Sequence, residues 1–143
     1  MVNPEKVNGL LRNLQSGLRL LRQITQMDQK LFLGDDLALG AAKYYLQTAI
    51  ETCIDIGNHL ISSEGYRAPR DYPDVFTILE ENGVVTDRQA VKLRQMAGLR
   101  NRLVHLYWEI DDQLIYQYIQ GNLNDFDEYI QAVLGFLRRT KIN

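Results

Sequence analysis

The chain has 143 residues, 45% of them hydrophobic, and a formal net charge of −2 at pH 7. These values predict a single domain, residues 1–143, and exclude a general electrostatic grip on nucleic acid, so such binding must use a local basic patch. The chain has a single cysteine, Cys53, so an internal disulfide is excluded. No apolar run approaches the ~18 residues that cross a bilayer, and the N-terminus lacks a secretory signal. We therefore expect a cytoplasmic protein without membrane contact.

Apolar side chains recur every three or four residues in the first half of the chain, which predicts two long helices there. The first begins after Asn3, a plausible N-cap followed by Pro4, and reaches Met27. A break near Gly34 ends this segment and caps the next. The second helix is predicted from about residue 36 to residue 62.

The second half contains one clear loop, residues 62–73, which is rich in turn-forming residues. Thr86 and Gln89 form a capping box that opens a third long helix. No strand pattern is present, so the sequence predicts an all-α fold, an antiparallel up-and-down bundle of four main helices plus short extra helices. The other helices of this half are predicted at residues 74–83, 111–122 and 124–139.

The third long helix carries a cluster of polar side chains in the stretch GLRNRLVHLYWE, residues 98–109. At about 100° per residue, Arg100 falls at the centre of the apolar side of the helix, whereas Asn101, Arg102 and His105 lie towards other faces. A buried arginine is costly unless an anion or a second surface meets it, although a surface arginine whose stem covers apolar neighbours is the alternative. We expect Arg100 to line a cleft or a subunit interface.

The chain has two histidines, His59 and His105. On a straight helix His105 lies about 140° from Arg100, which disfavours a close pair within one chain. His59 is expected to form hydrogen bonds within the bundle or to support the site, and its role and that of Asn58 stay open.

The stretch RNRLVHLYW resembles the signature of HEPN-domain proteins, which is an arginine, a polar residue, three further residues and a histidine, here Arg100, Asn101 and His105. Tyr107 completes the pattern R-x4-H-x-Y, which is similar to the HepT toxin branch of that superfamily, also described as a domain of unknown function, DUF86. The likeness extends from about residue 4 to residue 137. It includes YYLQTAIETCIDIGNHLIS, PRDYPDVFTILEENGVV and NLNDFDEYIQAVLGFL.

This resemblance implies a single HEPN-like helical domain that acts as a metal-independent endoribonuclease toxin without a cofactor. It implies a type VII toxin–antitoxin pair in which an MntA-like nucleotidyltransferase antitoxin transfers AMP from ATP to Tyr107. It also implies a homodimer, which would place two copies of His105 in one cleft. The substrate would be RNA rather than DNA, and the sequence does not identify which RNA.

The chemistry fits these side chains. RNA supplies its own nucleophile, the 2′-hydroxyl, and leaves a 2′,3′-cyclic phosphate. Arg100 would clamp the charged phosphorane, and His105 would move the proton. Asn101 would orient either the phosphate or the imidazole, and Arg102 is a candidate RNA contact.

Two other functions fit the same residues. Some HEPN proteins are thought to be non-catalytic modules that bind nucleotides for a separate nucleotidyltransferase, and a purely structural dimerising bundle is the third alternative. The intact Arg100, His105 and Tyr107 favour the nuclease.

Two weaker clusters have simpler explanations. The acidic residues Glu109, Asp111 and Asp112 could form a metal site, but they fall at a helix start, where N-capping accounts for them. A basic strip on the first helix could touch RNA phosphate, although a solvated helix face explains it equally. The strip consists of Arg12, Arg19 and Arg22.

Overall fold

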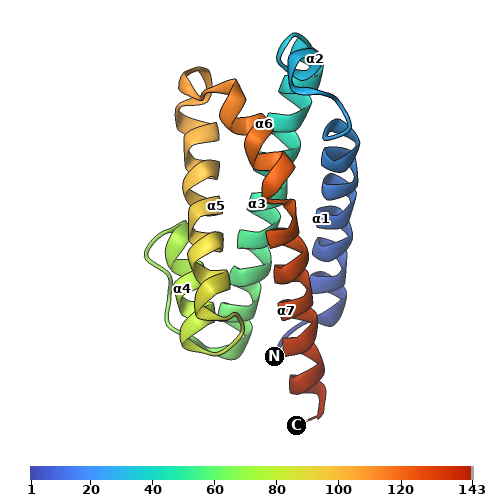
Figure 1. Ribbon diagram of the computed structural model, residues 1–143. Helices are drawn as coiled ribbons and strands as arrows, with labels where there is room; N and C mark the ends of the chain where they lie inside the picture. Colours follow the sequence, from blue (N-terminus) through green and yellow to red (C-terminus); the bar gives the residue numbers. More distant parts are fainter. Residues whose placement is uncertain (143) are drawn as a thin grey trace.

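A computed structural model describes residues 1–142, and this part of the chain contains helices and no strands. Four long helices run up and down along one axis, and both chain ends lie at the same end of the bundle (Figure 1). These are α1 (Pro4–Ile24), α3 (Asp36–Glu64), α5 (Asp87–His105) and α7 (Leu123–Ile142). The shorter elements are α2 (Gln29–Leu33), α4 (Tyr72–Glu81), the 3₁₀ turn η1 (Tyr107–Glu109) and α6 (Asp112–Gly121). The predicted up-and-down bundle with short extra helices is confirmed.

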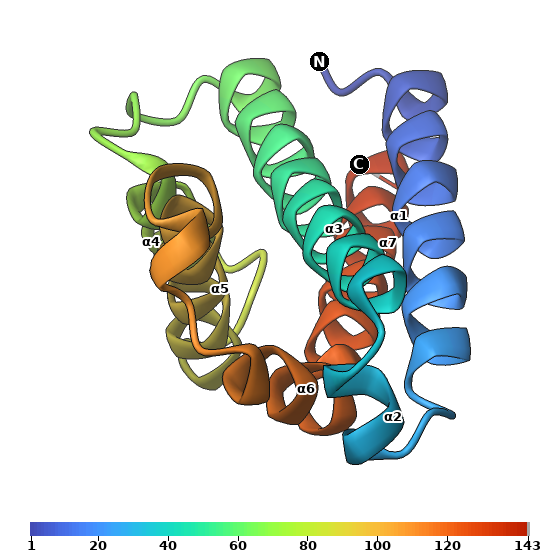
Figure 2. The same ribbon diagram turned by 90° about the horizontal axis from the view of Figure 1, so that it is seen from above.

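Helix α3 lies at the centre of the bundle. Seen from above, α1 and α7 cover one side of it, and α5 with α4 covers the other (Figure 2). Buried apolar side chains from all the long helices fill the space between these layers. Inside this core the Tyr129 hydroxyl donates a 2.9 Å hydrogen bond to the Cys53 carbonyl oxygen, and its ring meets Phe76 edge to face. Every buried side-chain nitrogen or oxygen atom among the described residues has a hydrogen-bond partner.

Side-chain caps set the helix starts. Thr86 and Gln89 form the predicted capping box, and Asn3 caps α1 as expected. The first helix ends at Ile24 rather than Met27, because the Asp28 carboxylate accepts from the Leu31 backbone N–H and opens α2. The prediction was therefore one turn too long at this end.

Helix α3 begins at Asp36 as predicted, whereas the start of α4 differs from the prediction. Helix α4 begins at Tyr72 instead of residue 74, since the Asp71 carboxylate accepts from the Asp74 backbone N–H. Helix α3 ends at Glu64 and is capped by Gly65, whose φ of +70° lies in the left-handed region that glycine adopts without strain. Tyr72 thus belongs to the first turn of a helix and is fixed beside the bundle.

Gly57 allows α3 and α4 to approach closely. A Cβ atom at this position would lie 2.5 Å from Val75 Cγ1 and 3.4 Å from the Tyr129 hydroxyl. Because such a contact is too short for two carbon atoms, glycine is required for this packing. Among residues 1–142, no helix has both the length and the apolar character that a membrane span requires.

Candidate functional site

Arg100 lies on α5 and points towards α3. Its Nε and Nη2 atoms donate hydrogen bonds of 3.0 and 2.9 Å to Oε2 of Glu51, and Nη1 donates a 3.2 Å hydrogen bond to Oδ1 of Asn101. The guanidinium also lies over the ring of Tyr72, 4.8 Å from its centroid. Only 15% of the Arg100 side chain is exposed, so it lines the inner edge of the α3–α5 interface, and the expectation that it is not a free surface residue is confirmed.

The structure corrects one detail of the predicted setting. Arg100 does not sit among apolar neighbours alone, because Glu51 supplies an anion within the same chain. Val104, which lies four residues after Arg100 and so on the same side of α5, is 39% exposed. Arg100 therefore lies at the edge of the apolar side of α5, where it meets Glu51, and not at the centre of that side.

Sequence reasoning missed Glu51 and Tyr72. Glu51 is a charged residue of α3 that directly follows the buried Ile50 and lies two residues before the buried Cys53, which is the signal that could have found it. Tyr72 lies between the two prolines of the loop, and its exposed fraction is 41%. Both meet Arg100 through contacts between distant segments, which helix periodicity does not report.

A shallow pocket of about 190 Å³ opens at this point. Burial and the negative charge of Glu51 raise the pKa of the Asp55 carboxyl above its ordinary value. The guanidinium thus pairs with one carboxylate, that of Glu51, and shares the pocket with a second carboxyl group, that of Asp55. The pocket is lined by Glu51, Ile54, Asp55, Tyr72 and Arg100.

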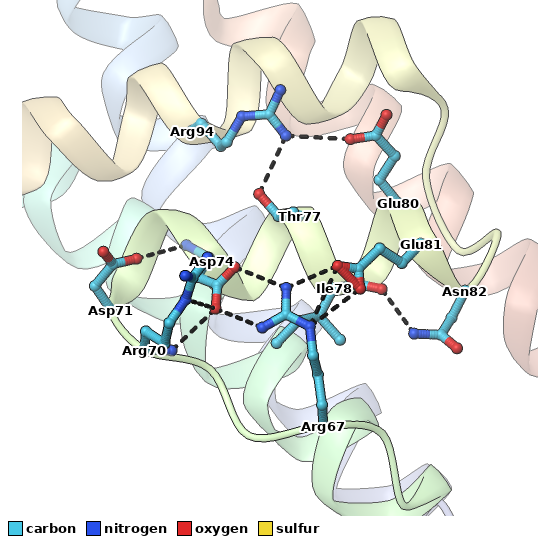
Figure 3. A network of polar contacts seen from close by, with 10 residues as sticks. All are labelled: Arg67, Arg70, Asp71, Asp74, Thr77, Ile78, Glu80, Glu81, Asn82 and Arg94. Atoms are coloured by element: carbon cyan, nitrogen blue, oxygen red, sulfur yellow. Dashed lines mark hydrogen bonds and ion pairs between the residues drawn. The ribbon is translucent and has the colours of Figure 1, made fainter.

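A network of charges holds the segment that carries Tyr72 (Figure 3). Arg67 donates two hydrogen bonds, of 2.8 and 2.9 Å, to the two oxygens of the buried Asp74 and a third, of 2.7 Å, to Glu81. The Arg70 backbone N–H donates to the same Asp74 carboxylate at 3.0 Å. These bonds hold the pKa of Asp74 well below its usual range, and they fix the loop on the first turn of α4, where Tyr72 begins.

The other predicted site residues lie near the C-terminal end of α5. His105 is its last residue and is exposed, and Arg102 is also exposed. Within residues 1–142 no hydrogen bond joins His105 to Arg100, as expected from their separation on a straight helix. Asn101 orients the guanidinium, an alternative to the expected contact with phosphate or imidazole. One chain therefore presents Arg100 and His105 as two neighbouring but separate groups.

Tyr107 opens the turn η1 directly after α5 and is half-buried. The ammonium of Lys43 lies over its ring, 4.5 Å from the centroid, and forms an ion pair of 3.1 Å with Asp112. Trp108 meets the Tyr107 ring edge to face at 5.0 Å and is 91% exposed. The turn thus places a half-buried aromatic side chain, Tyr107, and an exposed one, Trp108, close after His105 in the chain.

The remaining candidates have structural roles. Nε2 of His59 accepts a 3.1 Å hydrogen bond from the Asn3 backbone N–H, which confirms the expected role within the bundle. Burial and the nearby positive charges of Lys6 and the N-terminal ammonium lower the pKa of His59. Asp111 caps α6, as predicted. Among residues 1–142, no three His, Cys, Asp or Glu side chains are grouped as metal ligands would be.

Comparison with known proteins identifies the family. The profile of the family described as Ribonuclease HepT-like matches residues 14–133, which include α5 and the turn after it. The chain belongs to this family. The mRNA nuclease HepT of Shewanella oneidensis is 33% identical to it over 109 residues, which are 76% of this chain and 78% of that protein.

Solved structures show the same HepT-like fold. The tri-AMPylated HEPN toxin of Shewanella oneidensis, in complex with MNT antitoxin, has a TM-score of 0.84 and 27% identity, covering 90% of this chain and 96% of that one. YutE of Bacillus subtilis, a cytosolic protein described as of unknown function, has a TM-score of 0.86 and 24% identity, covering 97% and 93%. The second likeness is one of fold alone, and together they confirm the HEPN architecture.

Proposed function

We propose that this chain is a HepT-type endoribonuclease toxin that cleaves RNA through the 2′-hydroxyl without a metal or cofactor. The observation that carries the proposal is the R-x4-H-x-Y motif of a HepT-like chain, with Arg100 braced at a pocket and His105 and Tyr107 exposed or half-exposed at the adjoining helix end. Its relative in Shewanella oneidensis is named an mRNA nuclease. We take residues 1–143 as one HEPN-like domain that acts in the cytoplasm.

The contacts of Arg100 leave it able to bind phosphate. Arginine has five N–H bonds in a planar fork. Glu51 takes the edge formed by Nε and Nη2, and Asn101 takes one hydrogen of Nη1. One hydrogen on each terminal nitrogen is not used by these contacts, and that pair can grip two phosphate oxygens of the phosphorane. Glu51 therefore fixes the guanidinium and leaves its outer edge for RNA.

His105 is assigned the proton transfer. It is exposed at the end of α5, where an RNA backbone can reach it, and an imidazole can accept the 2′ proton or protonate the leaving 5′ oxygen. One histidine cannot supply acid and base together, so we assign the second to the His105 of another copy of the chain in a homodimer. Arg102, exposed on the same helix, is assigned an RNA contact.

Tyr107 is assigned the modification that silences the toxin. A relative in Shewanella oneidensis is tri-AMPylated and bound to an MNT antitoxin, and Tyr107 lies two residues from His105 with its side chain only half-buried. We infer that a nucleotidyltransferase antitoxin transfers AMP to this hydroxyl. The added phosphate would stand beside the site and repel the RNA backbone.

RNA cleavage by purified variants tests the proposal. We expect Arg100→Ala and His105→Ala to lower the cleavage rate by at least about a hundredfold, because each removes charge or proton transfer from the transition state. Arg94→Ala is a matched control, since Arg94 lies on the same helix and pairs with Glu80 away from the pocket. The products should carry a 2′,3′-cyclic phosphate.

Two outcomes would contradict this proposal, one its site and the other its activity. Equal cleavage by all variants would remove the site assigned here. A wild-type chain that binds nucleotide but cuts no RNA, with binding lost in Arg100→Ala, would instead support the non-catalytic nucleotide-binding module.

A further inference from the structure

Lys43 is one of two charged residues with almost fully buried side chains among the described residues, and it lies directly beneath Tyr107. Its exposed fraction is 5%. The N-terminal part of α3, the turn after α5 and the start of α6 meet here, at one end of the bundle (Figure 1). The ammonium joins all three through its 3.1 Å ion pair with Asp112 and its position 4.5 Å from the Tyr107 ring centroid.

A buried ammonium is costly, and apolar residues could fill the same space. Removing a lysine from water requires an anion and further contacts in return, and an apolar side chain is often equally stabilising at such a position. Asp112 is 43% exposed and supplies only part of the compensation. The ammonium makes a further favourable contact, a cation–π interaction with the ring of Tyr107. This arrangement holds the ring in place while no hydrogen bond within residues 1–142 engages the Tyr107 hydroxyl.

We propose that Lys43 is a positioning residue for the modification of Tyr107, an inference that rests on the proposed function. The Lys43 ammonium, itself oriented by Asp112, holds the Tyr107 ring so that its hydroxyl faces the incoming nucleotide. The same ammonium lies over the ring, close to the negative charge that spreads into the ring when the Tyr107 hydroxyl loses its proton.

The reaction balances as an ordinary nucleotidyl transfer. Oη of Tyr107 forms a bond to the α-phosphorus of ATP, and the bond from that phosphorus to the oxygen bridging to the β-phosphate breaks. Pyrophosphate leaves, and the phenolic proton passes to a base of the transferase. As the proton departs, charge develops on Oη and on the ring carbons, and a fixed cation over the ring stabilises that charge more than it stabilises the neutral phenol.

The rate of AMP incorporation, followed by intact mass with the cognate nucleotidyltransferase and ATP, tests this role. Lys43→Met removes the charge and keeps the length of the side chain, and we expect kcat for modification to fall about tenfold with KM little changed. Lys43→Arg keeps the charge and should retain most of the rate. The control is Lys92→Met, because Lys92 pairs with Asp125 at 3.7 Å elsewhere on the bundle.

RNA cleavage by the unmodified variants separates positioning from folding. Lys43→Met should cleave RNA at the wild-type rate and should escape neutralisation, because its Tyr107 is modified slowly. Parallel loss of cleavage, modification and thermal stability in Lys43→Met would show a merely structural lysine and overturn the inference. If Lys43→Met were modified with the same kinetics as the wild type, the role of Lys43 would be overturned and the proposed modification would stand. If the wild-type chain took up no AMP, the proposed modification would be overturned as well.

Discussion

Arg100 and Glu51 form an ion pair that joins α5 to α3, with both Nε and Nη2 of the arginine directed at a single carboxylate oxygen. The pair is partly shielded from water, since the exposed fractions of the two side chains are 15% and 33%. Glu51 consequently determines which edge of the guanidinium faces the pocket, and a residue far from the motif in sequence controls its geometry.

Replacing Glu51 by alanine should free Arg100 to turn. We expect RNA cleavage to fall by about tenfold to a hundredfold, because the edge of Arg100 that we propose binds phosphate is no longer held in one orientation. The free energy of unfolding should fall by only about 1 kcal/mol, since water screens part of the pair. Cleavage assays and urea unfolding measure the two effects.

Glu80→Ala is the matched control for that substitution. Glu80, on α4, pairs at 3.2 Å with Arg94 of α5, the helix that carries Arg100, and its side chain is buried to a degree similar to that of Glu51. It should cost similar stability and leave cleavage intact. Equal loss of cleavage in both variants would show that Glu51 acts only on stability.

Asp74 should make the stability of the protein depend on acid pH. Its pKa lies well below the ordinary value of 3.8, because Arg67 donates to the ionised carboxylate. The depressed pKa means that this stabilisation is complete above about pH 5 and is lost as the pH falls through 3.8 towards the lower folded-state value. Thermal unfolding of Asp74→Asn should therefore vary less with pH across this range than that of the wild type.

Asp87→Asn is the control, because Asp87 is an exposed residue at the start of α5. It should keep the wild-type pH dependence. If Asp74→Asn showed the same dependence of thermal stability on pH as the wild type, the acid sensitivity would belong to other carboxylates.

Gly57→Ala should strain the contact between α3 and α4. The new methyl group would meet Val75 Cγ1 at 2.5 Å, and we expect the free energy of unfolding to fall by about 1–3 kcal/mol. Val75→Ala should destabilise the wild type yet relieve the strain in the Gly57→Ala background. A double-mutant cycle measures this coupling, and strictly additive effects would argue against the close approach.

Cys53 should be inert to thiol reagents in the folded protein. It is fully buried, and burial raises the pKa of its thiol far above the ordinary value. Alkylation should be slow in buffer and become rapid in denaturant. Fast labelling of a sample that remains folded by circular dichroism would contradict the burial of this side chain.

Much of the fold could be predicted because helix signals are local. The capping box at Thr86 and the cap at Asn3 each depend on residues within one turn, and both occur as expected. The errors lie where a side chain opened a helix earlier than the apolar pattern indicated. Asp28 and Asp71 did so, and a short polar residue in a loop can cap a helix or merely turn the chain.

The candidate site was only partly predictable. The motif gave Arg100, His105 and Tyr107, but their partners Glu51, Tyr72 and Lys43 come from other helices. Helical periodicity gives the direction of a side chain around its own axis and does not give the element that it meets. The separation of Arg100 from His105 followed from that direction, whereas the ion pair with Glu51 required the packing of α3 against α5.

The segment beside the pocket is held by charged contacts in addition to the apolar packing of α4. Arg67, which binds Asp74 and Glu81, is 41% exposed, so dissolved ions reach it and weaken its bonds. Concentrated salt should loosen Tyr72 and its neighbours while the apolar centre of the bundle stays intact. The salt concentration should therefore be controlled in any activity assay on this protein. A lower rate at high salt would reflect a loosened loop beside the pocket and not loss of the fold.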